Sequence, residues 1–408
     1  MFFNDVWVAG NQPRDRDQDL REPRIITISG QNSRKLYIVV VTIGPARCFF
    51  TGAIIEVNRV SLLTPEQLTS LAEAAVAAPW ADNRRAFRLQ THGVNGLQLF
   101  ATPDLQNAAP TRRILGLLSI GAVAENLAIR AGRLGLHSKP IWQVDLKGGS
   151  LLVEFVCDRT NTVEDPLDTA IERRHSNRRL LFRGPRLESA AQERLSAEAS
   201  TIDGAALVWL DRPEQRRRVL GLIRLAETER FRNEELHREL FDSVRFDVGW
   251  YASASEGLSP GSLELPRVEQ LGFSVLRHWR VQRAANLVGT HQIIGLRSAD
   301  LPCRLAPHLC AIVAQGEDEP AAIQAGRLLQ RVWLRATLLG LAVQVYAAST
   351  VYALDKSTAI GDELRGRLAS GWNELCPQAR PFIVFRMGRA AQPSAPASRP
   401  PAASVLSG

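Results

Sequence analysis

The residues with the clearest chemical potential form one short basic run. Residues 173–179 read Arg-Arg-His-Ser-Asn-Arg-Arg, which places four guanidiniums, an imidazole and a hydroxyl close together. Guanidiniums match phosphate oxygens with paired hydrogen bonds and stay charged, while His175 and Ser176 add neutral donors. The run therefore predicts a binding site for an anion, most simply a phosphate. From composition alone, a solvated basic end of a helix is an equally good interpretation.

Composition sets broad limits on the class of protein. A chain of 408 residues with 45% hydrophobic and 23% charged residues is typical of a globular protein with about two or three domains. The net charge of +8 suits an anionic ligand. Arginine greatly outnumbers lysine in this chain, and codon bias in a GC-rich genome produces the same excess. The net charge is therefore weak evidence for an anionic ligand. Aromatic residues make up only 6%, and no helix-turn-helix, RNP or zinc pattern occurs, so we expect no nucleic-acid partner.

The cysteines and the chain start bear on the cellular compartment. Five cysteines are scattered without a CxxC pair or a neighbouring histidine cluster, which predicts reduced, buried thiols and no metal site: Cys48, Cys157, Cys303, Cys310 and Cys376. The first residues lack a basic segment followed by an apolar one, and no run of about 18 apolar residues occurs. We expect a cytoplasmic protein without a membrane partner.

The two ends of the chain differ from the rest. Residues 1–60 contain strand-like runs at 25–28, 36–43 and 53–57, which predict a small β-rich appendage or the remnant of a larger domain. Residues 390–408 are rich in Pro, Ala and Ser with almost no apolar bulk, which predicts a disordered tail. Helix and strand signals between these ends predict an α+β fold.

The best-defined helix start is at Thr64. Thr64 is a good N-cap, Pro65 suits the first turn, and Gln67 stands at the capping-box position. This helix should end near residue 78, because Pro79 follows. Further helices are expected at 111–134, 213–231, 236–241, 271–285 and 321–339, and further strands at 87–90, 97–101, 151–156, 205–210, 310–314 and 381–386.

Two of the long helices resemble each other at an offset of 205 residues. Each ends in Leu-Gly-Leu, where the glycine can cap the helix and the chain turns back into a strand. Together with the matching strand order, this predicts a duplicated α+β unit, with halves 61–165 and 166–389 forming an intrachain pseudo-dimer around the two helices. The aligned residues are Gly121, Arg130, Ala131, Leu134, Gly135 and Leu136 on Gly326, Arg335, Ala336, Leu339, Gly340 and Leu341.

The basic run resembles the phosphate-binding segment of the nitroreductase family of FMN enzymes. Arg174, His175, Ser176 and Arg178 occupy the positions at which that family holds the phosphate and ribityl chain of FMN. Within the family, the chain resembles the long single-chain branch with two family folds in tandem. The resemblance therefore implies a nitroreductase-like α+β fold.

Two further segments carry the same resemblance. Residues 78–87 resemble the segment that covers the flavin from the partner subunit in dimeric members, and keep Pro79 and Asn83. Trp80 replaces a serine of that segment, and residues 85–86 replace a Gln-Pro pair. Arg386, on the last predicted strand, matches a basic residue that supplies another phosphate contact.

The resemblance implies an FMN-dependent oxidoreductase that passes electrons from NAD(P)H to a small nitroaromatic or quinone-like acceptor. The flavin performs the chemistry, so no catalytic acid, nucleophile or metal ligand is expected. One site per monomeric pseudo-dimer is expected, because the only basic candidate for a second site, at residues 112–113, lacks the serine. The alternative is a degenerate member that binds or sequesters flavin, or recognises a partner, without turnover. In such a member, the side chains of Trp80, Arg84 and Arg85 could prevent turnover by closing the face of the flavin on which nicotinamide must stack.

Overall fold

The computed structural model describes residues 24–29, 35–41, 54–58, 63–93, 95–142, 151–159, 164–316, 318–354 and 360–407. The chain divides into two compact units, Met1–Leu63 and Thr64–Gly408. In the first unit, three strands form an antiparallel sheet at the three places where strands are predicted: β1 (Arg24–Ser29), β2 (Lys35–Val41) and β3 (Ile54–Asn58).

The second unit contains two sheets. Its first sheet has the order β12-β4-β5-β7-β6, antiparallel except for the parallel pairing of β12 with β4. Three helices accompany this sheet in the sequence: α1 (Pro65–Ala77), α2 (Pro103–Gln106) and α3 (Pro110–Arg133). The strands are β4 (Phe87–His92), β5 (Gly96–Ala101), β6 (Leu136–Trp142), β7 (Leu151–Arg159) and β12 (Leu406–Ser407).

The other sheet, of order β10-β11-β9-β8, is antiparallel throughout. Antiparallel sheets with helices packed against them confirm the α+β class. The strands are β8 (Ala205–Trp209), β9 (His308–Ala314), β10 (Ala342–Tyr346) and β11 (Arg380–Gly388). The helices are α4 (Ser189–Ala197), α5 (Pro213–Arg232), α6 (Glu234–Asp242), α7 (Arg267–Leu276), α8 (Trp279–Asn286), α9 (Thr290–Gly295), α10 (Leu301–Leu305), α11 (Asp318–Leu338), α12 (Ala348–Leu354) and α13 (Asp362–Leu375).

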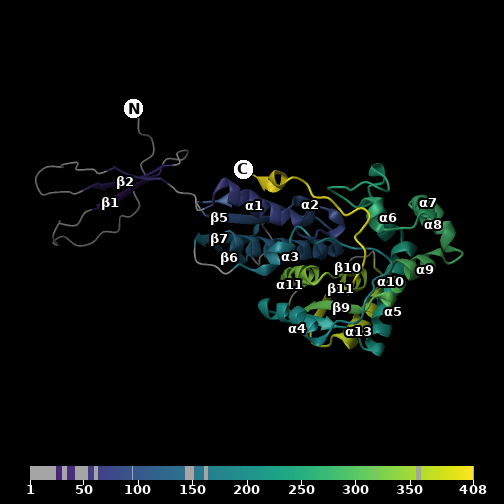
Figure 1. Cartoon of the computed structure of the whole chain (residues 1–408). Helices are drawn as coiled ribbons and strands as arrows, with labels where there is room; N and C mark the ends of the chain where they lie inside the picture. The colour runs from purple at the N-terminus through teal and green to yellow at the C-terminus, as the bar shows by residue number, and fades with distance from the viewer. Residues whose placement is uncertain are drawn as a thin grey trace, which may run out of the picture. The chain divides into compact units, whose positions relative to one another are not determined.

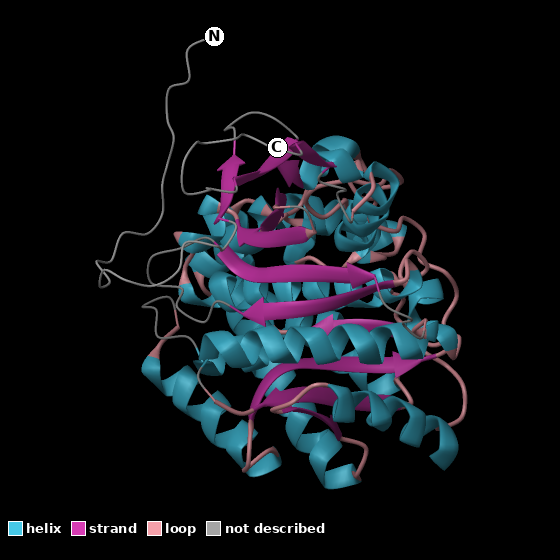
Figure 2. Cartoon of the chain, turned by 90° about the vertical axis from the view of Figure 1, so that its left-hand side faces the viewer, coloured by secondary structure: helices cyan, strands magenta, loops and turns pink. Residues whose placement is uncertain are grey.

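Helices α3 and α11 pack directly against each other in the middle of this unit, between the strands of the two sheets (Figure 1). Figure 2 shows the same alternation of strands and helices from the side. The helix backbones approach most closely at two glycines. A Cβ atom on Gly121 would collide with the carbonyl of Ile323, and one on Gly326 would collide with the carbonyl of Leu118. Ile323 follows Leu118 by the same 205 residues that separate the glycines, so the contact is reciprocal.

Polar groups also cross between these two helices. Asn126 Oδ1 accepts a hydrogen bond of 2.6 Å from Gln330 Nε2, and Asn126 Nδ2 donates to Ala74 O of α1 at 2.7 Å. Glu125 pairs with both Arg327 and Arg331 at 2.9 Å. Buried polar groups are costly to separate from their partners, so these bonds define the register of α3 on α11.

The capping signals at the start of α1 are confirmed. Thr64 Oγ1 accepts from the amide of Gln67 at 3.2 Å, and the amide of Thr64 donates to Gln67 Oε1 at 3.0 Å. Farther along, the single helix predicted at 271–285 is instead two helices, α7 and α8. His278 between them is extended, and Nε2 of His237 lies 2.8 Å from the carbonyl oxygen of Leu276. The Leu276 carbonyl therefore has a hydrogen-bond partner outside its own helix.

Residues 390–407 adopt a defined path, which differs from the disorder predicted for this tail. The 3₁₀ turn η7 (Ala402–Val405) packs on α1, and β12 extends the first sheet beside β4. The side chains of Ala395 and Val405 are buried. The segment appears in yellow across α1 in Figure 1. The sequence predicted disorder because these residues contain few apolar side chains. In the structure, their backbone groups bond to other parts of the unit.

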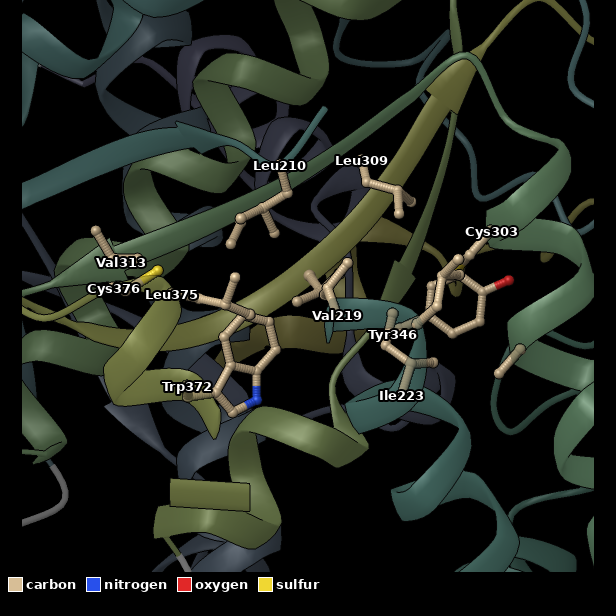
Figure 3. Packing of buried hydrophobic residues seen from close by; sticks show 14 residues of the cluster. Leu210, Val219, Ile223, Cys303, Leu309, Val313, Tyr346, Trp372, Leu375 and Cys376 are labelled. Carbon is tan, nitrogen blue, oxygen red and sulfur yellow. The ribbon is translucent and has the colours of Figure 1, made fainter. Parts of the chain in front are cut away.

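The largest core cluster described lies against the second sheet (Figure 3). Trp372 of α13 packs there among leucines and valines, and its Nε1 donates to Ser349 O at 3.0 Å. Cys303 and Cys376 belong to the same cluster, and burial raises their pKa values to about 12 and about 11. The prediction of buried cysteines is confirmed for Cys157, Cys303, Cys310 and Cys376, while Cys48 lies outside the described residues.

Within the part of the chain that the structure describes, one helix, α3, is long and apolar enough to cross a membrane by length and composition. Of its most apolar window, 89% is buried inside the protein, against α1, α11 and β6. Its apolar character is therefore accounted for by its place in the core.

The buried thiols should be slow to react. In a Cys48→Ser variant, we expect an aromatic disulfide reagent to modify no thiol rapidly under native conditions, because burial shields the sulfurs and raises the pKa of Cys303, Cys310 and Cys376. All four should react after denaturation. Rapid modification of a native thiol would show that the core packing described here is wrong.

The glycine contacts between α3 and α11 should be essential for stability. Gly121→Ala is expected to lower the free energy of unfolding by about 1 to 3 kcal/mol, because the added methyl group collides with a backbone carbonyl. The control is Gly221→Ala in α5, where an added Cβ meets no atom within 4 Å. That change should raise stability by about 0.5 to 1 kcal/mol through helix propensity. Urea unfolding measures both, and equal effects would contradict the reciprocal contact.

Candidate functional site

The segment that follows α1 turns sharply inward. Trp80 leads into η1 (Ala81–Asn83), where Asp82 and Asn83 both have positive φ, 51° and 54°. Asp and Asn tolerate this conformation better than other non-glycine residues. The turn buries the side chain of Asn83, which is 3% exposed. Its Nδ2 donates to the carbonyls of Ala254 and Gly257 at 3.0 Å, so the turn is fastened to the loop at residues 254–257.

The basic run is a loop fixed at both ends. Before it, η2 (Pro166–Ala170) is capped by the Asp165 carboxylate, and the amide of Arg174 donates to Ala170 O at 2.9 Å. Within it, Ser176 forms a β-bridge with Val343 of β10, and the amide of Asn177 donates to Val343 O at 3.0 Å. These backbone bonds direct the Arg174 side chain toward the end of α1.

Arg174 is a buried cation with unused donors. It is 6% exposed, its Nη2 donates to Ala77 O at 3.2 Å, and its guanidinium lies over the ring of Trp333 at 4.5 Å. Its Nε and Nη1 are buried without a hydrogen-bond partner. Burial lowers the pKa of Arg174 well below its usual value, and the charge of Arg399 lowers it further. A buried guanidinium is expensive unless an acceptor meets its donors.

A second guanidinium reaches the same place from the C-terminal segment. Arg399 Nη2 donates to Ala78 O at 2.8 Å, Nη1 donates to Asn83 Oδ1, and the guanidinium lies over the ring of Trp80 at 5.0 Å. Burial lowers the pKa of Arg399 to about 10. Among the residues that the structure describes, no carboxylate forms an ion pair with Arg174 or Arg399. Two like charges therefore adjoin each other without a negative partner.

The other residues of the run have mixed surroundings. Burial lowers the pKa of Arg178, against the opposing charges of Asp82 and Glu264, and its Nη1 donates to Ser262 O at 3.3 Å. Burial also lowers the pKa of His175, whose Nδ1 lies 2.9 Å from Arg173 O. Because the charge of Asp82 acts to raise the pKa of Arg178 against the effect of burial, the Arg178 guanidinium lies near η1.

Arg386 does not match the phosphate contact predicted for it. The side chain is 0% exposed, and its Nε donates to Gln344 Oε1 at 2.9 Å. Nη1 donates to the carbonyls of Leu180 and Pro302 at 2.9 and 3.0 Å, and Nη2 donates to that of Arg179. Its donors are thus directed at the Gln344 side chain and at backbone carbonyls, and Arg386 supports the basic run from within the core.

The structure brings together Arg174, Asn83 and the backbone beside Pro79, all named as site residues from the sequence, and places Arg399 among them, while Arg386 lies apart. The indole Nε1 of Trp80, next to Arg399, is also buried without a partner. The unsatisfied groups here are all donors, and a phosphate offers only acceptors. This donor set therefore fits a phosphate group. The sequence held one signal for Arg399: it is the only charged residue in 390–408.

A cavity of about 310 Å³ opens beside the same segment. It is lined by charges of both signs, including Arg84, Arg112, Asp104 and Glu256. Arg113, the neighbour of Arg112 in the predicted second basic site, pairs instead with Glu319.

No model of a known protein family matches the sequence, and the search of curated proteins found no relative. Several solved structures are similar to this chain, at identities of 10 to 17% and TM-scores of 0.27 to 0.32.

Three of them illustrate the range. An FMN-dependent nitroreductase of Mycobacterium smegmatis, solved with NADPH, is 16% identical with a TM-score of 0.31, and the alignment covers 55% of this chain and 86% of that one. A nitroreductase with bound FMN from Bacteroides fragilis is 12% identical (56% and 89%, TM-score 0.29). A BluB-like flavoprotein from Clostridium difficile is 11% identical (60% and 98%, TM-score 0.32). Because the TM-scores are near 0.3, we base no functional conclusion on these similarities.

The two buried arginines should respond oppositely to loss of charge. Without ligand, Arg174→Met is expected to leave the free energy of unfolding unchanged or to raise it by up to about 1 kcal/mol, because it removes a poorly satisfied charge. Arg386→Met should lower it by roughly 3 kcal/mol or more, because several backbone carbonyls lose their donor. Urea unfolding of the ligand-free protein measures both values. Equal losses would contradict the distinction between an unsatisfied and a satisfied guanidinium.

Proposed function

We propose that this chain is an FMN-dependent oxidoreductase of nitroreductase type, with NAD(P)H as electron donor and a small nitroaromatic or quinone-like acceptor. The observation that carries the proposal is the buried Arg174 guanidinium, whose Nε and Nη1 lack acceptors at the place where the sequence resemblance expects the flavin phosphate. We also keep the cytoplasmic location and the absence of membrane and nucleic-acid partners as predictions.

The residues around Arg174 suit the parts of the cofactor. Arg174 would bind the phosphate, with the hydroxyl of Ser176 as a neutral donor beside it. Arg178 would place a cation near the pyrimidine edge of the flavin. Asn83 has its amide donors engaged with Ala254 and Gly257, so in this proposal it positions the cover of the site instead of donating to the ring.

When bound, FMN would supply the chemistry by accepting hydride from NAD(P)H and passing electrons to the acceptor. The protein would bind the phosphate, orient the ring and exclude water. Trp80 would help to exclude water, because its side chain is buried and its ring packs edge-on against Phe87 at a centroid distance of 5.6 Å. No proton-transferring side chain is required by this proposal.

We further propose that the two halves form a tandem pseudo-dimer with one flavin site. The reciprocal contacts of Gly121 and Gly326, at the offset that aligns the two long helices, support a two-fold relation. Gly135 and Gly340, which end these helices, share a φ of 69°. In this arrangement the first half contributes the cover around Asn83 and the second half contributes the basic run.

A second candidate is flavin binding without turnover. It is favoured by the way three side chains near the cover are fixed: Trp80 is buried, Arg84 donates to Asp242 O at 2.6 Å, and Arg85 donates to Ser404 O at 2.6 Å. If these groups close the face where nicotinamide must stack, NADPH cannot reach the flavin. Steady-state NADPH oxidation with a nitroaromatic acceptor separates the two functions, because only the oxidoreductase consumes NADPH.

The first test is the absorbance spectrum of the purified, desalted protein, with chromatographic identification of any released chromophore. Flavin bands with about one FMN per chain are expected from the single site. A colourless protein that also fails to take up added FMN would contradict the proposed function.

Arg174→Ala should weaken FMN retention about 10- to 100-fold, because it removes a charge-assisted contact to the phosphate worth roughly 1.5 to 3 kcal/mol. The matched control is Arg173→Ala, which removes an exposed guanidinium from the same run and should retain FMN as the parent does. Equal retention by both variants would place the phosphate elsewhere. The measurement is FMN fluorescence in the filtrate after repeated ultrafiltration.

A further inference from the structure

The C-terminal segment, residues 390–407, runs from the second half to the first. At its start, Asn177 Nδ2 donates to Ala391 O at 2.8 Å, and Arg179 Nη2 donates to Gln392 O at 3.1 Å. Both donors belong to the basic run. The segment is therefore attached directly to the loop that carries Arg174.

Farther along, the same segment covers the turn around Asn83. Ser253 Oγ donates to Pro396 O at 2.7 Å, next to the loop that fastens Asn83. Arg399 then contacts Asn83 and Ala78, and beyond it Arg85 donates to Ser404 O at 2.6 Å. The segment ends as β12 beside β4. It thus crosses the whole candidate site, from the basic run to the first sheet.

Charge is concentrated at one point of this segment. Residues 390–408 contain no Asp, Glu or Lys, and Arg399 is the single charged side chain. That side chain lies where it lowers the pKa of Arg174, and burial lowers its own. Carbonyls at the end of α1 accept one hydrogen bond from each guanidinium, but carbonyl dipoles offset only part of the repulsion between two full charges.

A segment that blocked a cationic anion site would be expected to bring an acidic side chain, which would pair with Arg174. Residues 390–407 bring a second cation and no Asp or Glu. The arrangement becomes favourable when an anion lies between the two guanidiniums, because each then gains a charge-assisted acceptor. The structure thus favours a segment that closes over an anionic ligand, and disfavours one that replaces it.

We propose that Arg399 binds the same anionic group as Arg174, and that residues 390–407 form a strap held closed by a bound phosphate monoester. Identification of that ligand as FMN rests on the proposed function. Because a ligand that binds the closed form preferentially stabilises it, the strap should be more protected with ligand than without. Ligand release in turn requires Arg399 to detach.

The first experiment measures the FMN dissociation constant of the apoprotein by quenching of flavin fluorescence. Arg399→Gln should weaken binding about 10- to 100-fold through loss of a charged phosphate contact. Arg399→Lys, which keeps the charge, should recover part of the loss. The control is Ser407→Ala, which loosens the same segment by removing the hydrogen bond from Ser407 Oγ to Leu89 O at 3.0 Å but lies outside the cation pair, and should stay within about threefold of the parent. Equal effects of Arg399→Gln and Ser407→Ala would overturn the proposal.

A variant that ends at Arg389 distinguishes a strap from a plug. Loss of the strap should weaken FMN binding at least as much as Arg399→Gln does. Tighter binding after truncation would show that the segment blocks the site, and would overturn the proposal. Circular dichroism and the unfolding midpoint of the truncated protein establish that the rest of the chain remains folded.

Hydrogen exchange of residues 390–407 tests closure without any activity measurement. FMN should slow exchange in this segment in the parent, and should do so much less in Arg399→Gln. Exchange that is the same with and without FMN in a protein that binds FMN would overturn the proposal.

The same measurement separates this inference from the proposed function. If the parent binds no FMN, the flavin function fails, and inorganic phosphate becomes the probe. Slower exchange of the segment in phosphate than in chloride at equal ionic strength would still support the strap. If the parent binds no FMN and residues 390–407 exchange at the same rate in phosphate and in chloride, the strap proposal is overturned.

Discussion

The close packing of α3 against α11 is the constraint on which the rest of the second unit depends. The two backbones meet at Gly121 and Gly326, where any side chain would hold them apart. Hydrogen bonds from Asn126 and ion pairs from Glu125 then define the register of the two helices. With the helices fixed, the end of α1 is brought to the loop that carries Arg174.

At that meeting point the protein treats two buried arginines in opposite ways. Arg386 is surrounded by carbonyls that accept its donors, so it contributes to the core. Arg174 is almost equally buried, yet two of its nitrogens have no acceptor. Two unsatisfied nitrogens on a buried guanidinium cost stability, so this contrast is the physical basis for proposing a ligand at Arg174.

Arg399 extends this reasoning from one residue to a segment. Cations usually avoid each other in low-dielectric surroundings, and a lone arginine in a polar segment would ordinarily lie in solvent. Here it is placed beside Arg174 and anchored on Asn83. An anionic ligand would therefore be bound by two separate parts of the chain, the basic run and the C-terminal segment, while carbonyls at the end of α1 hold the two guanidiniums in place.

The sequence by itself determined what depends on near neighbours. The capping box at Thr64, the bounds of α3 and α11 within a few residues, their repeat, and the anion-binding composition of the basic run all follow from local patterns. Tertiary structure alone decided which arginines face the site. A guanidinium is identical in sequence whether acceptors meet each of its nitrogens, as they do in Arg386, or leave two of its nitrogens without a partner, as in Arg174. The order of residues 390–407 was likewise decided by distant partners, because its own composition offers too little apolar surface to predict it.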